Sequence, residues 1–250
     1  MSENQVWFRF YEELNDFLPF AKRKTSFPYA NKGNQSVKDA IEALGVPHVE
    51  VDMVIVNGKP VDFSYKLRNK DQISVYPVFE SFDVSKASSL RAKPLRDTKF
   101  ILDVHLGRLS KYLRLCGFDT LFENHFTDGE IIDRSLEEYR IILTRDKGLL
   151  KNKRVTHGYW IRSTKPDEQL SEVIKKFDLK NGLHPFTRCL ECNGILADVQ
   201  KEEIIDKLLP KTKDFYNGFK KCPVCSKIYW EGSHYERMKS FIGSLIINNF

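Results

Sequence analysis

Two pairs of cysteines constrain the fold of this chain more than any other feature. Cys189 and Cys192 form one C-x-x-C motif, and Cys222 and Cys225 form a second. Each pair can form a tight turn that offers two thiolates, and four thiolates complete a closed tetrahedral Zn²⁺ site. A closed site leaves no position for a substrate. We therefore expect a structural zinc that stabilises a segment with a thin core, residues 183–250.

The fifth cysteine and the expected cytoplasmic location are both consistent with a metal site. Clustered thiols in a cytosolic chain indicate metal binding rather than disulfides, and neither pair follows a thioredoxin-like strand. Cys116 lies on the apolar face of a predicted helix and is expected in the core. The N-terminal residues lack the pattern of a signal peptide, and no apolar run is long enough to span a bilayer. We expect a cytoplasmic protein without a membrane partner.

Length and composition predict a globular chain of several domains. The chain has 250 residues, of which 41% are hydrophobic and 30% charged, which excludes a disordered or fibrous protein. Changes of pattern along the chain predict four segments: an N-terminal domain over 1–82, a polar linker over 83–97, an α/β domain over 98–182 and the cysteine segment over 183–250.

Residues 1–82 show the order of elements of a small ubiquitin-like β-grasp domain. A strand through Val6, Phe8 and Phe10 precedes a helix over 37–44, which Ser36 can cap, and Gly45 ends that helix. Further strands follow, with an Asn-Gly hairpin signal between two of them.

The segments VIVNGKPVD and LRNKDQISVYP resemble the sulfur-carrier branch of the ubiquitin-like superfamily. A sulfur carrier needs a free Gly-Gly carboxyl terminus, whereas here the chain continues past Tyr76 without one. We therefore expect a recognition or docking module for a protein partner.

Residues 98–182 alternate strand-like and helix-like patterns, which predicts a parallel sheet with helices on its faces. Asp103 closes one predicted strand, and Asp146 follows another. Asp128 and Glu130 open a helix after a third strand. Because the carboxyl ends of parallel strands meet at one edge, these acids are expected to converge. Converging carboxylates suit Mg²⁺ or Mn²⁺, although each acid alone is more often a turn or cap residue.

A local basic excess lies beside the first of these acids. Residues 86–115 hold eight basic and two acidic residues, and Arg108, Lys111 and Arg114 recur every three positions opposite the apolar face of a helix. Such a stripe fits a polyanionic partner such as a nucleic-acid backbone, although most such stripes are solvated faces. Two further basic residues, Arg145 and Lys147, flank Asp146 and could hold a phosphate.

Several longer sequence motifs resemble one known family, and they are more specific than a C-x-x-C pair alone. FILDVHLGRLSKYLRLCGFDTLFEN, DGEII, RIILTRDKGLLK and HGYWIRST resemble the Mut-seven C-terminal RNase family, a PIN-like family. The segments PFTRCLECNGIL and CPVCSKIYWEGSHYERM resemble that family's C-terminal part, and some members carry a ubiquitin-like domain in front.

This resemblance implies an α/β fold: a PIN-like parallel sheet with flanking helices, an N-terminal α+β ubiquitin-like β-grasp domain and a C-terminal zinc ribbon. It implies a metal-dependent ribonuclease in which Asp103 and Asp146 bind Mg²⁺ or Mn²⁺. Asp128 and Glu130 both match the family's helix acid, and spacing does not decide between them. The alternative is a non-catalytic RNA-binding adaptor that uses the basic helix and the zinc ribbon.

Overall fold

The computed structural model of the chain describes residues 4–31, 33–77 and 98–248; the expected linker, 83–97, lies outside the described residues. The described chain divides into two compact units. One unit contains residues 4–77 and 128–160, and the other contains residues 98–127 and 161–248.

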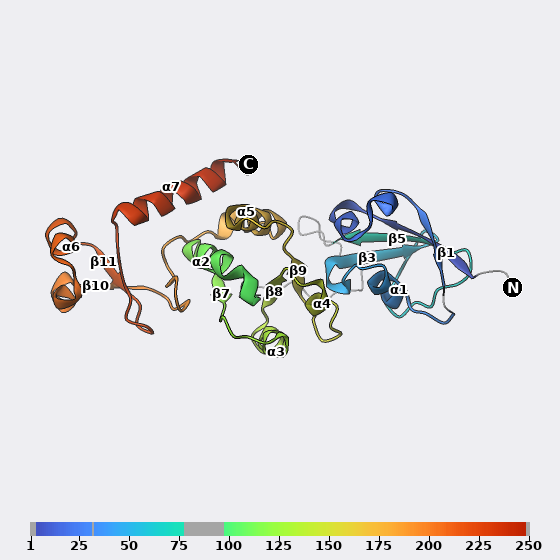
Figure 1. Cartoon of the computed structure of the whole chain (residues 1–250), viewed down its shortest axis with the longest axis horizontal. Helices are drawn as coiled ribbons and strands as arrows, with labels where there is room; N and C mark the ends of the chain where they lie inside the picture. The colour runs from blue at the N-terminus through green and yellow to red at the C-terminus, as the bar shows by residue number, and fades with distance from the viewer. Residues whose placement is uncertain (1–3, 32, 78–97, 249–250) are drawn as a thin grey trace. The chain divides into compact units, whose positions relative to one another are not determined.

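The N-terminal part of the first unit is a five-stranded sheet with one α-helix, shown in blue and cyan in Figure 1. The strands are β1 (Gln5–Phe10), β2 (Phe27–Ala30), β3 (Val51–Val56), β4 (Lys59–Val61) and β5 (Gln72–Pro77), in the order β2-β1-β5-β3-β4. The central pair, β1 and β5, is parallel and the other pairs are antiparallel. With α1 (Val37–Ala43) between β2 and β3, this is the predicted β-grasp.

Local chemistry explains where these elements begin and end. Ser36 caps α1 by accepting a hydrogen bond from the Asp39 N–H (3.1 Å), and the Asp39 side chain accepts one from the Ser36 N–H (3.4 Å). Gly45 follows the helix with φ +103°. Asn57 and Gly58 both have positive φ (50° and 80°), as the hairpin between β3 and β4 requires. These sequence predictions are confirmed.

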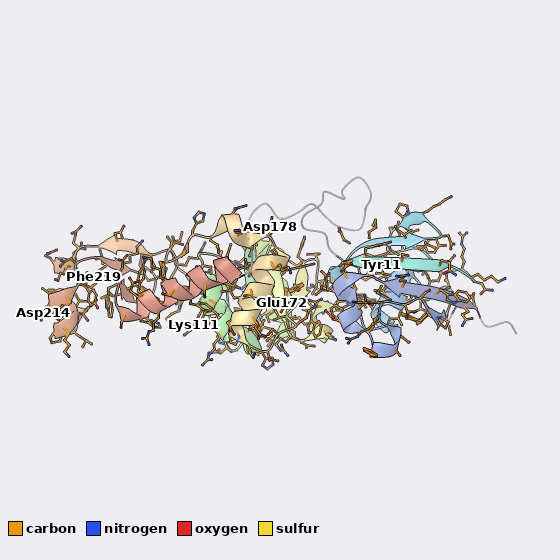
Figure 2. The ribbon with its side chains drawn as sticks, turned by 90° about the horizontal axis from the view of Figure 1, so that it is seen from above. Tyr11, Lys111, Glu172, Asp178, Asp214 and Phe219 are labelled. Atoms are coloured by element: carbon orange, nitrogen blue, oxygen red, sulfur yellow. The ribbon has the colours of Figure 1, made fainter. Side chains whose placement is uncertain are left out.

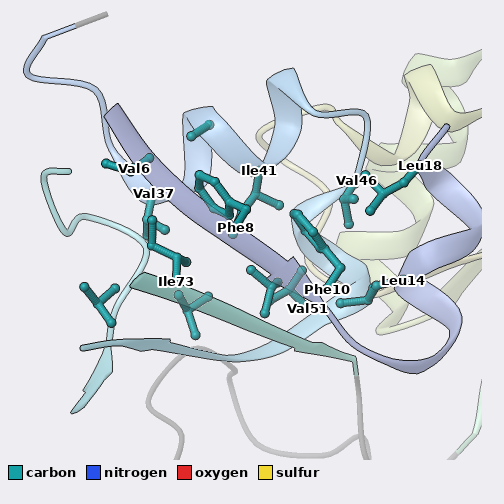
Figure 3. Packing of buried hydrophobic residues seen from close by; sticks show 14 of the residues in the cluster. Val6, Phe8, Phe10, Leu14, Leu18, Val37, Ile41, Val46, Val51 and Ile73 are labelled. Atoms are coloured by element: carbon teal, nitrogen blue, oxygen red, sulfur yellow. The ribbon is translucent and has the colours of Figure 1, made fainter. Parts of the chain in front are cut away.

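Among the described residues, seventeen buried hydrophobic side chains form the core of this domain. Figure 3 shows Phe8 and Phe10 of β1 among apolar side chains that include Val37 and Ile41 of α1. The chain between β1 and β2 forms two 3₁₀ turns, η1 (Glu12–Phe17) and η2 (Phe20–Lys22), and η1 contributes Leu14 and Phe17 to the same core.

The first unit also contains four elements from the α/β part of the chain: α3 (Asp128–Glu138), β8 (Ile141–Thr144), α4 (Lys147–Leu150) and β9 (Gly158–Trp160). Strands β8 and β9 are parallel. Every residue of β8 is buried, as its continuous apolar sequence predicts.

The second unit repeats this parallel arrangement with β6 (Lys99–Leu102) and β7 (Asp119–Leu121), joined through η4 (Val104–Leu106) and α2 (Gly107–Leu115). Helix α5 (Pro166–Lys176) packs on α2. Gly117 ends α2 with φ +96°, and a Cβ there would lie 2.3 Å from the His184 carbonyl oxygen. Glycine at 117 therefore lets the later chain pass directly over the end of α2.

The C-terminal part of the second unit has three short antiparallel strands, β10 (Ala197–Val199), β11 (Phe219–Lys221) and β12 (Ile228–Trp230), with α6 (Pro210–Phe215) between the first two. Its own core is small: Ile204, Leu208 and Phe219, the last labelled in Figure 2. The chain ends in α7 (Ser233–Asn248), a helix that we did not predict.

Candidate carboxylate positions and a cysteine metal centre

Asp103 and Asp146 occupy equivalent local positions. Each follows a parallel strand and caps the next helical turn: Asp103 Oδ1 accepts a hydrogen bond from the His105 N–H (2.7 Å), and Asp146 Oδ1 accepts one from the Gly148 N–H (2.6 Å). Asp103 is buried, whereas Asp146 is exposed. The same strand–Asp–helix geometry therefore occurs once in each unit.

The loop around Asp146 is held by short-range contacts. The Asp146 N–H donates to the buried Thr144 Oγ1 (2.8 Å). A Cβ at Gly148 would lie 3.0 Å from Asp146 Oδ1, so a small residue suits this position. These contacts fix the direction in which the carboxylate leaves the backbone.

Asp128 and Glu130 both lie in the first turn of α3, and both are exposed. They belong to the same unit as Asp146, whereas Asp103 belongs to the other. The convergence of the four acids, and the choice between Asp128 and Glu130, remain predictions of the sequence.

The basic stripe of α2 divides into two exposed residues and one buried residue. Arg108 and Lys111 are exposed, and Lys111, labelled in Figure 2, pairs with Glu191 Oε2 at 3.3 Å. Arg114 is only 3% exposed. Its Nε donates to Thr120 O (2.9 Å), and its Nη1 donates to the carbonyls of Leu190 (3.0 Å) and Glu191 (2.7 Å).

The prediction that Arg114 lies on a solvated, substrate-binding face is therefore wrong. A step of three residues turns an α-helix by about 300°. Each successive basic residue is therefore displaced by roughly 60° around the helix axis from the one before it. After two steps, Arg114 reaches the packed side of α2.

Arg145 and Lys147 flank Asp146, and the phosphate contacts expected of them remain predictions of the sequence. Both are half-buried. The Arg145 carbonyl accepts a hydrogen bond from Trp160 Nε1 (3.2 Å). Lys147 Nζ lies 3.9 Å from the ring centroid of Trp160 and 4.9 Å from that of Phe17. Lys147 thus contacts aromatic rings of its own chain.

The four cysteines come together as predicted. The Sγ atoms of Cys189, Cys192, Cys222 and Cys225 all lie within 4.8 Å of one another. Two of the pairs, Cys189 with Cys225 and Cys192 with Cys222, are 3.5 and 3.4 Å apart. Zn–S bonds of about 2.3 Å give tetrahedral S···S separations of about 3.8 Å. The donor set and its spacing therefore fit a single tetrahedral metal ion.

Both C-x-x-C turns have the same backbone. The N–H of each first cysteine donates to a carbonyl five residues on: Cys189 to Gly194 (2.7 Å) and Cys222 to Lys227 (2.9 Å). In each turn the fourth residue on has positive φ: Asn193 at 68° and Ser226 at 62°. A Cβ at Gly194 would lie 3.0 Å from Cys222 Sγ, so glycine lets the two turns approach closely.

Tyr229 supports the first turn from β12. Its hydroxyl oxygen lies 3.1 Å from Cys189 Sγ and accepts a hydrogen bond from the Leu190 N–H (3.0 Å). Burial opposes ionisation of Cys189, but the Tyr229 hydroxyl and backbone N–H groups lower the pKa of that thiol to about 6. A thiol that ionises easily is a better metal ligand at neutral pH. These contacts pack Tyr229 against the first cysteine turn.

Polar side chains that the sequence did not single out join the first turn to β7. Thr120 N–H donates to Asn193 Oδ1 (3.0 Å), and Asn193 Nδ2 donates to Asp119 Oδ1 (2.9 Å). Arg188 donates to the carbonyls of Gly117 (3.1 Å) and Asn193 (3.0 Å). The first cysteine turn, the end of α2 and β7 are thereby joined in one polar network. Asn193 could have been found from the sequence Cys-x-x-Cys-Asn-Gly, in which it directly follows the first cysteine pair.

Two further residues, Cys116 and Tyr235, lie in packed surroundings. Cys116 is buried, and burial raises the pKa of its thiol to about 12, so it is a core residue as predicted. The ring of Tyr235 packs against that of Phe186, with centroids 4.2 Å apart and the ring planes tilted by 37°. Within the described residues, no helix is long and apolar enough to cross a membrane.

The fold and site define a protein with a ubiquitin-like domain, parallel α/β elements and a four-cysteine centre. Residues 98–242 match the model of the Mut7-C RNase domain, and residues 3–83 match the model of the Mut7-C ubiquitin domain. The chain therefore belongs to the Mut7-C RNase family, which indicates a nuclease-type function.

Two further comparisons carry no weight in this assignment. No curated protein matches the chain. Among solved structures, the crystal structure of H. volcanii small archaeal modifier protein 1 is similar at 17% identity, with a TM-score of 0.25, over 30% of this chain and 98% of that chain.

Proposed function

We propose that the chain is a metal-dependent ribonuclease that hydrolyses RNA phosphodiester bonds. The observation that carries the proposal is the repeated strand–Asp–helix geometry at Asp103 and Asp146, within a domain that matches an RNase family. Aspartates after parallel strands are placed where α/β folds bind their ligands.

Asp103, Asp146 and one or both of Asp128 and Glu130 would hold Mg²⁺ or Mn²⁺, because hard carboxylate oxygens are the ligands these ions prefer. When bound, such an ion activates water and neutralises charge on the phosphodiester. Thr144 Oγ1 and the Gly148 N–H hold the Asp146 loop and its carboxylate in place.

RNA is the proposed substrate, and the exposed basic side chains are its proposed contacts. Arg108 and Lys111 on α2 are exposed, and Arg145 adjoins Asp146. Lysine and arginine side chains bind the phosphate backbone and make binding depend on salt. Arg114 is not among these contacts because its guanidinium is bound to backbone carbonyls.

At the cysteine centre we propose Zn²⁺ in a structural role. Four thiolates fill the coordination sphere of a tetrahedral ion and leave no open position. The network through Arg114, Asn193 and Arg188 connects this centre to α2 and β7, so zinc would stabilise the elements around Asp103 without entering the reaction.

The test is cleavage of labelled single-stranded and structured RNA with and without Mn²⁺. Asp103→Asn and Asp146→Asn should abolish cleavage and leave the melting temperature close to that of the wild type. Asp128→Asn and Glu130→Gln identify the helix acid. Asp167→Asn is a matched control, because Asp167 is also an exposed acid in the first turn of a helix.

Cleavage by Asp103→Asn at the wild-type rate would overturn the assignment. Binding of RNA that EDTA leaves unchanged, with no cleavage in any metal, would instead favour the adaptor.

A further inference from the structure

A single aromatic residue at the end of β9 connects the ubiquitin-like domain with the Asp146 loop. The Trp160 N–H donates to Glu50 Oε1 (2.6 Å), and the Trp160 ring lies 4.9 Å from the ring of Phe17. The indole Nε1 of the same residue donates to the Arg145 carbonyl (3.2 Å). Trp160 therefore contacts the domain with its backbone and ring, and holds the loop with its indole nitrogen.

Lys147 completes this contact from the loop. Its ammonium lies over two rings, that of Trp160 at 3.9 Å and that of Phe17 at 4.9 Å. A cation within about 6 Å of a ring centroid is attracted by the ring's electron density. One ring belongs to β9 and the other to η1 of the ubiquitin-like domain, so Lys147 is bound by both.

These contacts surround Asp146 on both sides along the chain. The carbonyl of residue 145 is held by Trp160, and the side chain of residue 147 is held by Phe17 and Trp160. Asp146 itself contributes its N–H to Thr144 Oγ1 and accepts the Gly148 N–H. The residues on both sides of Asp146 are therefore in contact with Trp160, and Lys147 also contacts Phe17 of the ubiquitin-like domain.

A second contact joins the ubiquitin-like domain to the segment that contains the Asp146 loop. His48 Nε2 lies 3.1 Å from the Val155 carbonyl oxygen, and His48 Nδ1 lies 2.7 Å from Glu42 Oε1. His48 is buried, as is Glu50 two residues later. One buried and one part-buried polar contact, together with one aromatic contact, therefore join the ubiquitin-like domain to this segment.

We infer that the ubiquitin-like domain acts within its own chain as the positioning element of the Asp146 loop, through the clamp formed by Phe17, Trp160 and Lys147. The inference rests on the proposed function for the catalytic role of Asp146. Phe17 and Lys147 are positioning residues, because they act through the loop. This deepens the expectation of a docking module: one surface that this domain recognises is the RNase part of its own chain.

The decisive measurement is hydrogen exchange of the Asp146 and Gly148 amides in the full-length, zinc-loaded protein, because these two amides donate the loop's hydrogen bonds. Phe17→Ala should accelerate their exchange about tenfold, since it removes one ring from the clamp. The matched control is Phe20→Ala, because Phe20 lies in the neighbouring turn but is 88% exposed; it should change neither rate.

Lys147→Met gives a second route if Phe17→Ala disturbs the core of its domain. Methionine keeps most of the apolar stem and removes the charge. Lys147→Met should also accelerate exchange of the two amides, and the effects of the two substitutions should be less than additive in the double variant, because both break the same clamp. Fully additive effects, or none, would overturn the inference.

RNA cleavage then separates this inference from the proposed function. If the clamp positions the carboxylate, Phe17→Ala lowers kcat about tenfold with little change in KM, since a misplaced group weakens the transition state rather than substrate binding. Wild-type protein that does not cleave RNA, but whose loop exchange responds to Phe17→Ala, would refute the ribonuclease and leave the clamp supported. If the protein cleaves RNA but Phe17→Ala changes neither the exchange of the loop amides nor kcat, the clamp alone is refuted.

Discussion

The two ends of this chain reach a defined fold by different means. In the part of the chain that the structure describes, the ubiquitin-like domain has seventeen buried hydrophobic residues in one cluster, whereas the cluster of the cysteine segment has three. The first domain is stabilised by removing apolar surface from water. The second segment has too small an apolar cluster for that, and we expect it to depend on the four thiolates and the polar network around them. Loss of one kind of contact should therefore affect one end and spare the other.

Removal of the metal should have the largest effect. Structural zinc contributes roughly 10–16 kcal/mol in zinc-finger peptides, so chelation or Cys222→Ser should unfold β10–β12 and leave the ubiquitin-like sheet intact. Hydrogen exchange measured separately over the two regions checks this, with metal content measured in parallel. Cys116→Ala, which removes a thiol outside the cluster, should retain the metal; protection of β10–β12 in the metal-free protein would contradict the prediction.

Truncation of the apolar core tests the opposite end. Phe8 is fully buried in β1, and Phe8→Ala should cost about 3–5 kcal/mol of unfolding free energy in the ubiquitin-like domain. Urea unfolding followed through amides of β1–β5 measures this. The exposed Phe20 provides the control, and Phe20→Ala should change stability by less than about 0.5 kcal/mol. Equal losses in the two variants would show that burial does not control this domain.

A smaller effect is expected where the metal centre meets α2. Arg114→Ala removes three hydrogen bonds, two of them to the first cysteine turn. Loss of groups that support metal ligands typically lowers metal affinity 10–100-fold, which competition with a chromophoric chelator measures. Arg108→Ala removes an exposed arginine of the same helix and should leave metal affinity unchanged. A weaker metal site in both variants would point to general charge rather than to the buried contacts.

The smallest effect is expected at the cap of α1. Ser36→Ala should cost about 1 kcal/mol. The hydrogen bond from Ser36 lowers the pKa of Asp39, so its stabilising effect is present above the usual carboxyl pKa of about 4 and is lost as pH falls through the lowered folded value. Unfolding experiments at neutral and acidic pH should show the difference between wild type and Ser36→Ala shrinking in acid. A constant difference would assign the cap to the hydroxyl alone.

Local chemistry made much of the fold predictable. Ser36, Gly45 and Asn57-Gly58 act within a few residues, and the elements they bound lie where the sequence predicts. The cysteines were equally informative because four thiolates have few other uses. Arg114 and Lys147 were not predictable, since their partners are remote: Arg114 binds carbonyls 76 and 77 residues away, and Lys147 binds the ring of Phe17. Helical spacing does not reveal such partners.

The contacts of Thr120 have a consequence for self-association. Strand β7 pairs with β6 on one side, and on the other side the Thr120 N–H and carbonyl are occupied by the side chains of Asn193 and Arg114. Unoccupied strand edges recruit strands from other molecules and seed aggregates. The first cysteine turn therefore covers this edge of β7, and we expect that release of the turn would expose the edge to strands of other molecules.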